Sequence, residues 1–408
     1  MSSPSLSSAP PAPSNPGADR HLFQLAVAIF VTFLAMGLAM PTLPLHLYHT
    51  LGASPLVIGI VVGCQFLAAL VSRAWCGNMA DTRGAQRALR VGLGFGVASG
   101  ALYLLSLAVV GMPWLSIGLL IAARAALGCT ESFSAVCSLS WGTGLIGPAR
   151  AGKVMSWVGM AMFGAYSVGA PLGALLYERF GFLAIGVAAL LLPVISLALV
   201  GRVPAVPVIA AAKRLPFRSV VGLVTLPGLG LAFAAAGFGS MTAFIALLFA
   251  ENRWGDASLA FTAFGAAYIL ARLLFGHLPD KIGGARVALA AAAVETLGMA
   301  LIWALGGHSP WGVYLGAAFT GFGFSLAFPG FGVEAVRRVP PANRGSAMGA
   351  YVAFLDVALA ITGPLAGLAA TAFGVRSVYG FGALVVAGGV AVGWLLVRQQ
   401  TASTEALK

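Results

Sequence analysis

The sequence predicts an all-α membrane protein with twelve transmembrane helices, arranged as two pseudo-symmetric six-helix bundles. Of its 408 residues, 60% are hydrophobic and only 8% are charged, and the mean hydropathy is +0.96. A water-soluble protein of this length needs more charge to cover its surface. Apolar segments of roughly 20 residues, enough to cross a bilayer, recur along the chain. Motifs of the first half also return in the second half.

The apolar segments, taken in chain order, set the expected domain boundaries. Residues 1–20 are rich in Ser and Pro and are expected to form a disordered cytoplasmic tail. The expected domains are an N-terminal bundle (21–201), a cytoplasmic linker (202–218), a C-terminal bundle (219–398) and a cytoplasmic tail (399–408). The predicted spans are 22–45, 56–76, 88–110, 115–141, 154–177, 182–200, 219–249, 258–275, 287–306, 311–335, 346–370 and 377–397.

The net charge of +12 reflects how Lys and Arg are distributed between the two sides of the membrane. With the N-terminus in the cytoplasm, every Lys and Arg lies on the cytoplasmic side or at its helix ends, except Arg124, Arg179, Arg253 and Arg376. Such asymmetry follows the positive-inside rule. We therefore expect a multi-pass protein of the bacterial inner membrane with both termini cytoplasmic, and no nucleic-acid partner.

Two internal repeats support the two-bundle prediction. Residues 72–89 and 271–288 share Arg73/Arg272, Gly77/Gly276, Asp81/Asp280, Gly84/Gly283 and Arg87/Arg286. Residues 148–182 and 341–375 share ten positions, including Pro171/Pro364 and Phe180-Gly181/Phe373-Gly374. Parallel repeats of this kind place the binding site between the halves, near the bilayer midplane.

These repeats carry a family resemblance. The run from Gly77 to Arg87 resembles the loop motif G-x-L-x-D-R-x-G-R-R of the major facilitator superfamily, with Thr82 and Ala85 departing from it, and the run from Gly276 to Arg286 is a second copy. The runs at 41–46, 124–132, 323–329 and 349–356 resemble the bacterial branch of arabinose-efflux-type permeases. The resemblance covers about residues 21–400.

The resemblance implies a cytoplasmic gate at the two loop motifs. Asp81 would face the N-terminus of the eleventh helix and Asp280 that of the fifth, where the helix dipole favours a carboxylate. The alternative is an ordinary turn with topogenic charges. The expected gating motif comprises Gly77, Asp81, Gly84, Arg87, Gly276, Asp280, Gly283 and Arg286.

Two charges share the fourth predicted helix. Arg124 and Glu131 are seven residues apart, which places them on nearly one face and roughly 10 Å apart, too far for direct contact. Each charge inside a bilayer costs on the order of 2.5–3.5 kcal/mol. The resemblance implies that this helix lines the cavity, and Arg124 matches an antiporter motif R-x-x-Q-G in which Leu127 replaces Gln. We expect the pair to bind substrate or protons; the alternative is a structural network between helices.

Three further polar residues inside spans are candidates for substrate or proton binding. Asp356 lies in the eleventh predicted helix and is a candidate proton carrier, with a packing hydrogen bond as the alternative. Gln65 could bind substrate or bridge two helices. Glu295 lies in the ninth helix, which the resemblance makes peripheral.

Other residues are assigned to the charge relay or to helix bending. Glu334, Arg272 and Arg73 form the expected charge relay, and Glu334 is expected to pair with Arg337, Arg338 or Arg286. Gly and Pro bend helices where halves meet. The expected bending positions are Gly169, Pro171, Gly363 and Pro364.

No catalytic or metal site is expected. The four cysteines, Cys64, Cys76, Cys129 and Cys137, lack metal-ligand spacing, and His46 and His49 lack a third ligand. The chain also lacks a Walker loop and a nucleophile–base set. We expect no cofactor, with the proton gradient as the energy source.

The function expected is secondary active transport: export of a small molecule in exchange for protons, by alternating access of a chain that works as a monomer. A proton-coupled importer, a uniporter and a lipid-handling protein remain open alternatives. The charges do not identify the substrate, because Arg124 favours an anion while Glu131 and Asp356 favour a cation.

Overall fold

The structure is a computed structural model that describes residues 16–147, 150–206, 217–255, 257–340 and 344–405. The prediction of an all-α fold is confirmed. The helices are α1 (Pro16–His49), α2 (Pro55–Arg83), α3 (Ala85–Ala108), α4 (Pro113–Ile146), α5 (Ala151–Val200), α6 (Phe217–Glu251), α7 (Ala257–Phe275), α8 (Leu278–Ile282), α9 (Gly284–Leu305), α10 (Pro310–Arg337), α11 (Arg344–Phe373) and α12 (Ser377–Glu405).

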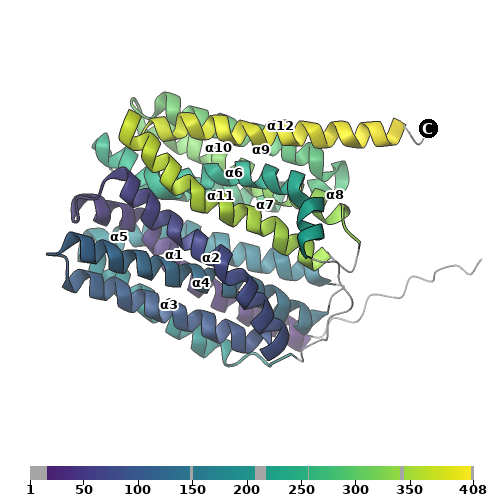
Figure 1. The fold of residues 1–408 in the computed structure, drawn as a ribbon, viewed down its shortest axis with the longest axis horizontal. Coiled ribbons are helices and arrows are strands. Elements are labelled where there is room, and N and C mark those ends of the chain that lie inside the picture. Colours follow the sequence, from purple (N-terminus) through teal and green to yellow (C-terminus); the bar gives the residue numbers. More distant parts are fainter. Residues whose placement is uncertain (1–15, 148–149, 207–216, 256, 341–343, 406–408) are drawn as a thin grey trace, which may run out of the picture.

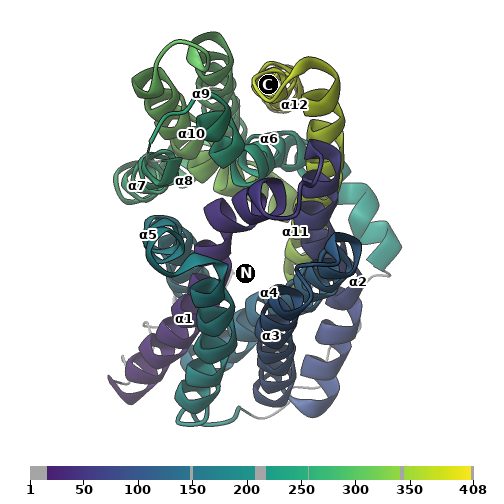
Figure 2. The same cartoon turned by 90° about the vertical axis from the view of Figure 1, so that its left-hand side faces the viewer.

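The helices form two groups that follow the chain order. Helices α1–α5 make up the lower group in Figure 1, and α6–α12 make up the upper group. Within the first group α1 packs on α5 and α3 on α4, and within the second α9 packs on α10 and α12. The groups, called the N-half and the C-half below, meet where α2 contacts α11 and α5 contacts α7 (Figure 2).

Eleven helices among the described residues are long and apolar enough to cross a membrane. One of them, α5, has 50 residues, and Gly181 within it has φ 66° and ψ −168°, so two helices meet at a kink there. Residues with a side chain rarely adopt this dihedral region, and glycine does so without steric cost. The predicted spans 154–177 and 182–200 therefore lie on the two sides of one interrupted element.

The expected tails differ from the observed helices. Helix α1 begins at Pro16 and α12 continues to Glu405, so residues 16–20 and 399–405 of the expected tails are helical, and the domain boundaries stay predictions. Proline at the first position of a helix leaves no internal hydrogen bond unmade. Residues 1–15, 406–408 and the linker segment 207–216 lie outside the described residues.

The two copies of the loop motif have the same backbone geometry. Gly84 separates α2 from α3 with φ 91°, and Gly283 separates α8 from α9 with φ 94°. We call this end of the molecule the α2–α3 end. The opposite end carries the α1–α2 turn (residues 50–54) and is called the α1–α2 end.

Close packing joins the halves near the α1–α2 end. A Cβ atom added to Gly59 of α2 would collide with the carbonyl oxygen of Gly363 in α11, and one added to Gly63 would lie 2.8 Å from the carbonyl oxygen of Ala360. Gly367 makes a similar approach to Pro55. Glycine allows this because it has no side chain to separate the two backbones.

Candidate functional site

An ion pair links the two halves inside the membrane-spanning region. The guanidinium of Arg73 in α2 contacts the carboxylate of Asp356 in α11. The Asp356 side chain is only 2% exposed and that of Arg73 is 16% exposed. Charges in such a position are costly unless they are paired. The predicted proton-carrier candidate therefore has a cation as its partner, supplied by the other half.

A second polar pair lies between α2 and α4 of the N-half. The Gln65 amide donates from Nε2 to Oε2 of Glu131 over 2.6 Å, and both side chains are buried. The helices approach closely here, because Gly128 faces the backbone carbonyl of Gln65. Gln65 thus bridges two helices, and because it also lines a pocket, substrate binding by Gln65 stays a prediction. Glu131 is also within electrostatic range of Asp356, Arg73 and Arg124.

Arg124 lies seven residues before Glu131 in α4, is 5% exposed and lines a pocket with Gln65. Among the described residues no carboxylate lies within ion-pair distance of it, and its Nε has no hydrogen-bond partner. The expectation that Arg124 and Glu131 are too far apart for direct contact agrees with this.

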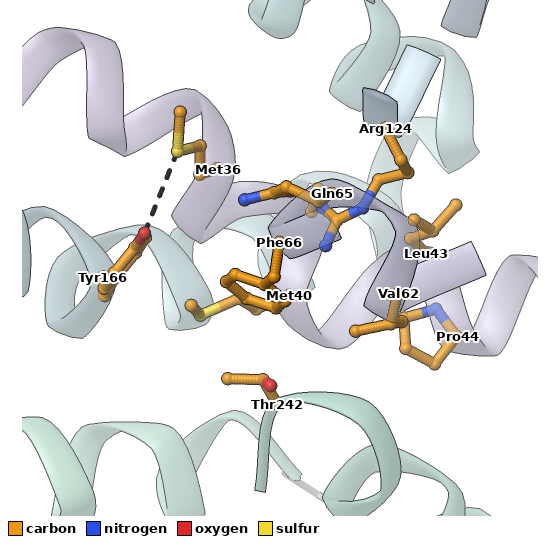
Figure 3. A pocket seen from close by; sticks show the side chains of 11 residues that line it. Met36, Met40, Leu43, Pro44, Val62, Gln65, Phe66, Arg124, Tyr166 and Thr242 are labelled. Atoms are coloured by element: carbon orange, nitrogen blue, oxygen red, sulfur yellow. Dashed lines mark hydrogen bonds between the residues drawn. The ribbon is translucent and has the colours of Figure 1, made fainter. Parts of the chain in front are cut away.

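The pocket encloses about 350 Å³ of space between atoms, including its opening. Gln65 and Arg124 extend into it beside Phe66 and Met40, and Thr242 of the C-half forms part of the facing wall (Figure 3). The complete lining is Met36, Ala39, Met40, Leu43, Pro44, Val62, Gln65, Phe66, Arg124, Tyr166 and Thr242. We call it the arginine pocket.

A second pocket lies against the first and crosses the contact between the halves. It spans about 280 Å³ of space between atoms, including its opening, and shares Met40 and Tyr166 with the arginine pocket. Its other lining residues are mostly aromatic: Phe163, Ser167, Phe238, Phe261, Phe264, Gly265 and Tyr268. We call it the aromatic pocket. Sequence reasoning missed it because its rings are spread over three helices from both halves.

Glu295 lies apart from these pockets. It is fully buried in α9, its carboxyl faces Gly237 of α6, and neither of its oxygens has a hydrogen-bond partner among the described residues. It lines neither pocket. The structure thus does not bring Glu295 together with the other predicted substrate or proton residues.

The predicted charge-relay residues occupy three separate places. Arg73 pairs with Asp356, as described. Arg272 donates to the Tyr268 hydroxyl over 3.3 Å and lies over its ring, 5.8 Å from the centroid. Glu334 lies 3.6 Å from Arg337, one of its expected partners.

Glu334 also closes the start of a helix. Its Oε1 accepts from the backbone N–H of Ala285 over 3.1 Å, and its Oε2 accepts from Gln400 over 2.9 Å. Ala285 lies in the first turn of α9, where backbone N–H groups have no partner within the helix. The geometry is therefore that of a helix cap supplied by a neighbouring helix.

The gating motif lies at the α2–α3 end. The Asp81 side chain is exposed and forms no ion pair or hydrogen bond within the described part of the chain. The side chains of Asp280 and of residues 344–346, which begin α11, lie outside the described residues, so the two expected latches stay predictions. Arg87 is exposed, and Arg286 is exposed in the second copy.

The predicted bending positions lie where helices approach closely. Gly169 faces the backbone of Gly37 in α1, and Gly363 faces Gly59 in α2. Pro171 and Pro364 lie inside helices that continue past them. Within the described part of α5, the residue with non-helical dihedral angles is Gly181. These glycines thus serve close packing, and bending at them stays a prediction.

The histidine and cysteine candidates have packing contacts. His46 is buried and stacks on Phe182 with ring centroids 4.2 Å apart. The Cys76 and Cys137 sulfur atoms lie 3.7 Å apart and both thiols are free. Among the described residues no group of three His, Cys, Asp or Glu could hold a metal ion.

Comparisons with known proteins place these observations in context. A sequence profile of the Major Facilitator Superfamily matches residues 25–253 and 227–407. An uncharacterized MFS-type transporter of Salmonella typhimurium is 42% identical over 93% of this chain and 97% of its own length. One of Burkholderia mallei is 40% identical over 98% of each chain.

Solved structures of transporters have the same fold. The nucleoside transporter NupG superposes with a TM-score of 0.69 over 93% of this chain and 98% of its own, at 16% identity. A human organic anion transporter superposes with a TM-score of 0.67 over 93% of this chain and 100% of its own, at 15% identity.

Proposed function

The chain belongs to the Major Facilitator Superfamily, and on that premise we propose that it is a secondary active transporter that exports a small molecule in exchange for protons. It is a membrane transporter and not an enzyme, as its relatives and structural neighbours are transporters. Export, proton coupling and the bacterial inner membrane are parts of the proposal. So is the narrower kinship with arabinose-efflux-type permeases.

The proposal includes twelve spans with both termini in the cytoplasm. The kink at Gly181 supports the count, because it divides the 50-residue α5 into two segments that can each cross the bilayer. The exposed basic residues of the loop motifs, Arg83, Arg87 and Arg286, lie at the α2–α3 end. By the positive-inside rule that end faces the cytoplasm.

Alternating access follows from how the halves meet. The glycine contacts between α2 and α11 hold the halves together near the α1–α2 end. This arrangement corresponds to a state closed to the outside. In the alternate state the Asp81 latch closes the cytoplasmic end and the glycine contacts open.

One observation carries the proposed coupling: the buried Gln65–Glu131 pair lies within electrostatic range of the Arg73–Asp356 ion pair between the halves. A proton on Glu131 changes the balance of charge around the ion pair and so affects whether Arg73 and Asp356 stay paired when the halves move. Arg124 in the adjoining pocket binds the substrate. The resemblance of its sequence context to the R-x-x-Q-G motif of antiporters supports export.

The test uses inverted membrane vesicles whose lumen is made acidic. A panel of sugars, amino acids, organic acids and cationic drugs is offered, and the accumulated compounds are measured by mass spectrometry. Vesicles with an uncoupler and vesicles carrying Glu131→Gln are expected to lose accumulation. Glu178→Gln, which removes an exposed carboxylate of α5, is the matched control and should retain it.

The outcomes separate the alternatives. Movement that survives the uncoupler and only equalises the concentrations on the two sides contradicts proton coupling and supports a uniporter. Uptake into right-side-out vesicles without accumulation in inverted ones shows an importer. Movement of a fluorescent lipid between leaflets, with no soluble compound transported, indicates a lipid-handling protein.

A further inference from the structure

The aromatic pocket is lined by six rings from both halves: Phe163, Tyr166, Phe238, Phe261, Phe264 and Tyr268. Phe163 of α5 stacks on Tyr268 of α7, with centroids 4.2 Å apart and planes at 25°. Phe238 stacks on Phe324 of α10, with centroids 5.4 Å apart and planes at 1°. Tyr166, Phe238 and Phe264 contact the same group. The remaining open faces and edges of these rings favour contact with a planar apolar group.

The arginine pocket adds one positive charge to this surface. Arg124 lines the arginine pocket, and among the described residues no other charged residue lines either of the two pockets. No carboxylate among the described residues pairs with Arg124 directly. Its Nε, a hydrogen-bond donor, is buried without a partner. Buried polar atoms of a binding site that lack partners can be satisfied by a ligand. An anionic group would supply both the missing charge and the missing acceptor for Arg124.

The nearby acidic groups are already engaged. Glu131 accepts from Gln65, and Asp356 pairs with Arg73, and neither carboxylate lines a pocket. A cage of aromatic rings can also bind cations. Here a cation would have to occupy a surface whose charged lining residue is Arg124, which opposes it.

We propose that the substrate is an organic anion with a planar apolar ring, whose anionic group binds Arg124 while the ring enters the aromatic pocket. This rests on the proposed function, since it names the substrate class of the same site. The two pockets share Met40 and Tyr166, so one molecule can reach both.

The test measures binding to the purified full-length protein by calorimetry, without any gradient. The probes are 1-naphthoate, the saturated decahydronaphthalene carboxylate, neutral 1-naphthamide and the cation 1-naphthylmethylammonium. We expect 1-naphthoate to bind most tightly. Loss of the charge should weaken binding by about tenfold or more, because Arg124 then lacks a charged partner. Loss of the planar ring should weaken it because a saturated ring cannot stack flat on the aromatic side chains.

Variants assign each part of the probe to its pocket. Arg124→Gln should weaken 1-naphthoate about tenfold and leave 1-naphthamide nearly unchanged, whereas Arg90→Gln, at an exposed arginine of α3, should alter neither. Phe163→Leu should reduce the preference for the planar over the saturated anion. Phe373→Leu, at a ring that is 72% exposed, is its control.

The selectivity of the unmodified protein decides the proposal even if a variant does not fold. Tighter binding of the ammonium probe, equal binding of planar and saturated anions, or binding of no probe by monodisperse protein overturns it. Planar anions that bind but are not driven by the gradient would leave the substrate class standing and refute proton-coupled export. Gradient-driven movement of a sugar or a cation, with no anion bound, would refute the proposed substrate class and leave proton-coupled transport standing.

Discussion

Arg73 and Asp356 form an ion pair that joins α2 of the N-half to α11 of the C-half. The same two helices are in glycine-mediated contact nearer the α1–α2 end. One helix pair therefore carries both an apolar contact and an electrostatic one, at different depths. Any rocking of the halves must change at least one of them.

The ion pair should show strong coupling between its partners. Arg73→Gln leaves the Asp356 carboxylate buried without a cation, and we expect this to destabilise the protein by about 3 kcal/mol. Asp356→Asn together with Arg73→Gln should cost less than the sum of the two single changes. Thermal unfolding of the purified variants measures this, and additive effects would show that the pair contributes nothing of its own.

Glu131→Gln should abolish proton-driven substrate movement while expression stays at the level of the unmodified protein. The amide keeps the shape of the side chain and its contact with Gln65, but it cannot gain or lose a proton. Transport in inverted vesicles is the measurement, and Glu178→Gln is the control. Unchanged coupled transport would remove Glu131 from the mechanism.

Gly363→Ala should weaken the closed α1–α2 end. The added methyl group meets the carbonyl oxygen of Gly59, and overpacking of this kind costs about 1–3 kcal/mol. Labelling of Thr242→Cys from the outside, in a protein otherwise free of cysteine, should become faster. Gly94→Ala, where a Cβ atom meets nothing within 4 Å, should leave the labelling rate unchanged.

Asp81→Asn should slow turnover while substrate binding is nearly preserved. Asp81 is exposed at the α2–α3 end and lines neither pocket, so its charge affects the gate and not the site. Transport rate and binding affinity are compared in the same preparation. Asp81→Glu, which keeps the charge, should recover part of the rate, and a large loss of affinity in Asp81→Asn would contradict the assignment.

Glu334→Ala should lower stability by about 1 kcal/mol, the typical value of a helix cap. The variant removes the acceptor for the Ala285 N–H at the start of α9. Thermal unfolding checks this, with Glu178→Ala as the control. If transport falls while stability is unchanged, Glu334 acts in a charge relay, as the sequence alone predicts.

The sequence predicts most of the fold because each membrane span and each copy of a repeat is recognised from a short run of residues. Gly181 and Gly374, at matched positions of one repeat, are an example, since both have positive φ, 66° and 84°. Pairings between distant residues are not local. The sequence marks Arg73 and Asp356 separately but not their ion pair, and no pattern connects Phe163 to Tyr268, which meet only when the halves pack together.

The shared construction of the aromatic pocket limits how selectivity can change. Phe163 and Tyr166 come from the N-half, whereas Phe238, Phe261, Phe264 and Tyr268 come from the C-half. A hybrid protein that combines the N-half of this chain with the C-half of a relative would keep Arg124 and Glu131 but exchange four of these rings. In such hybrids the preference for the substrate's ring would change with the C-half of the relative, whereas the coupling to protons would be kept with the N-half of this chain.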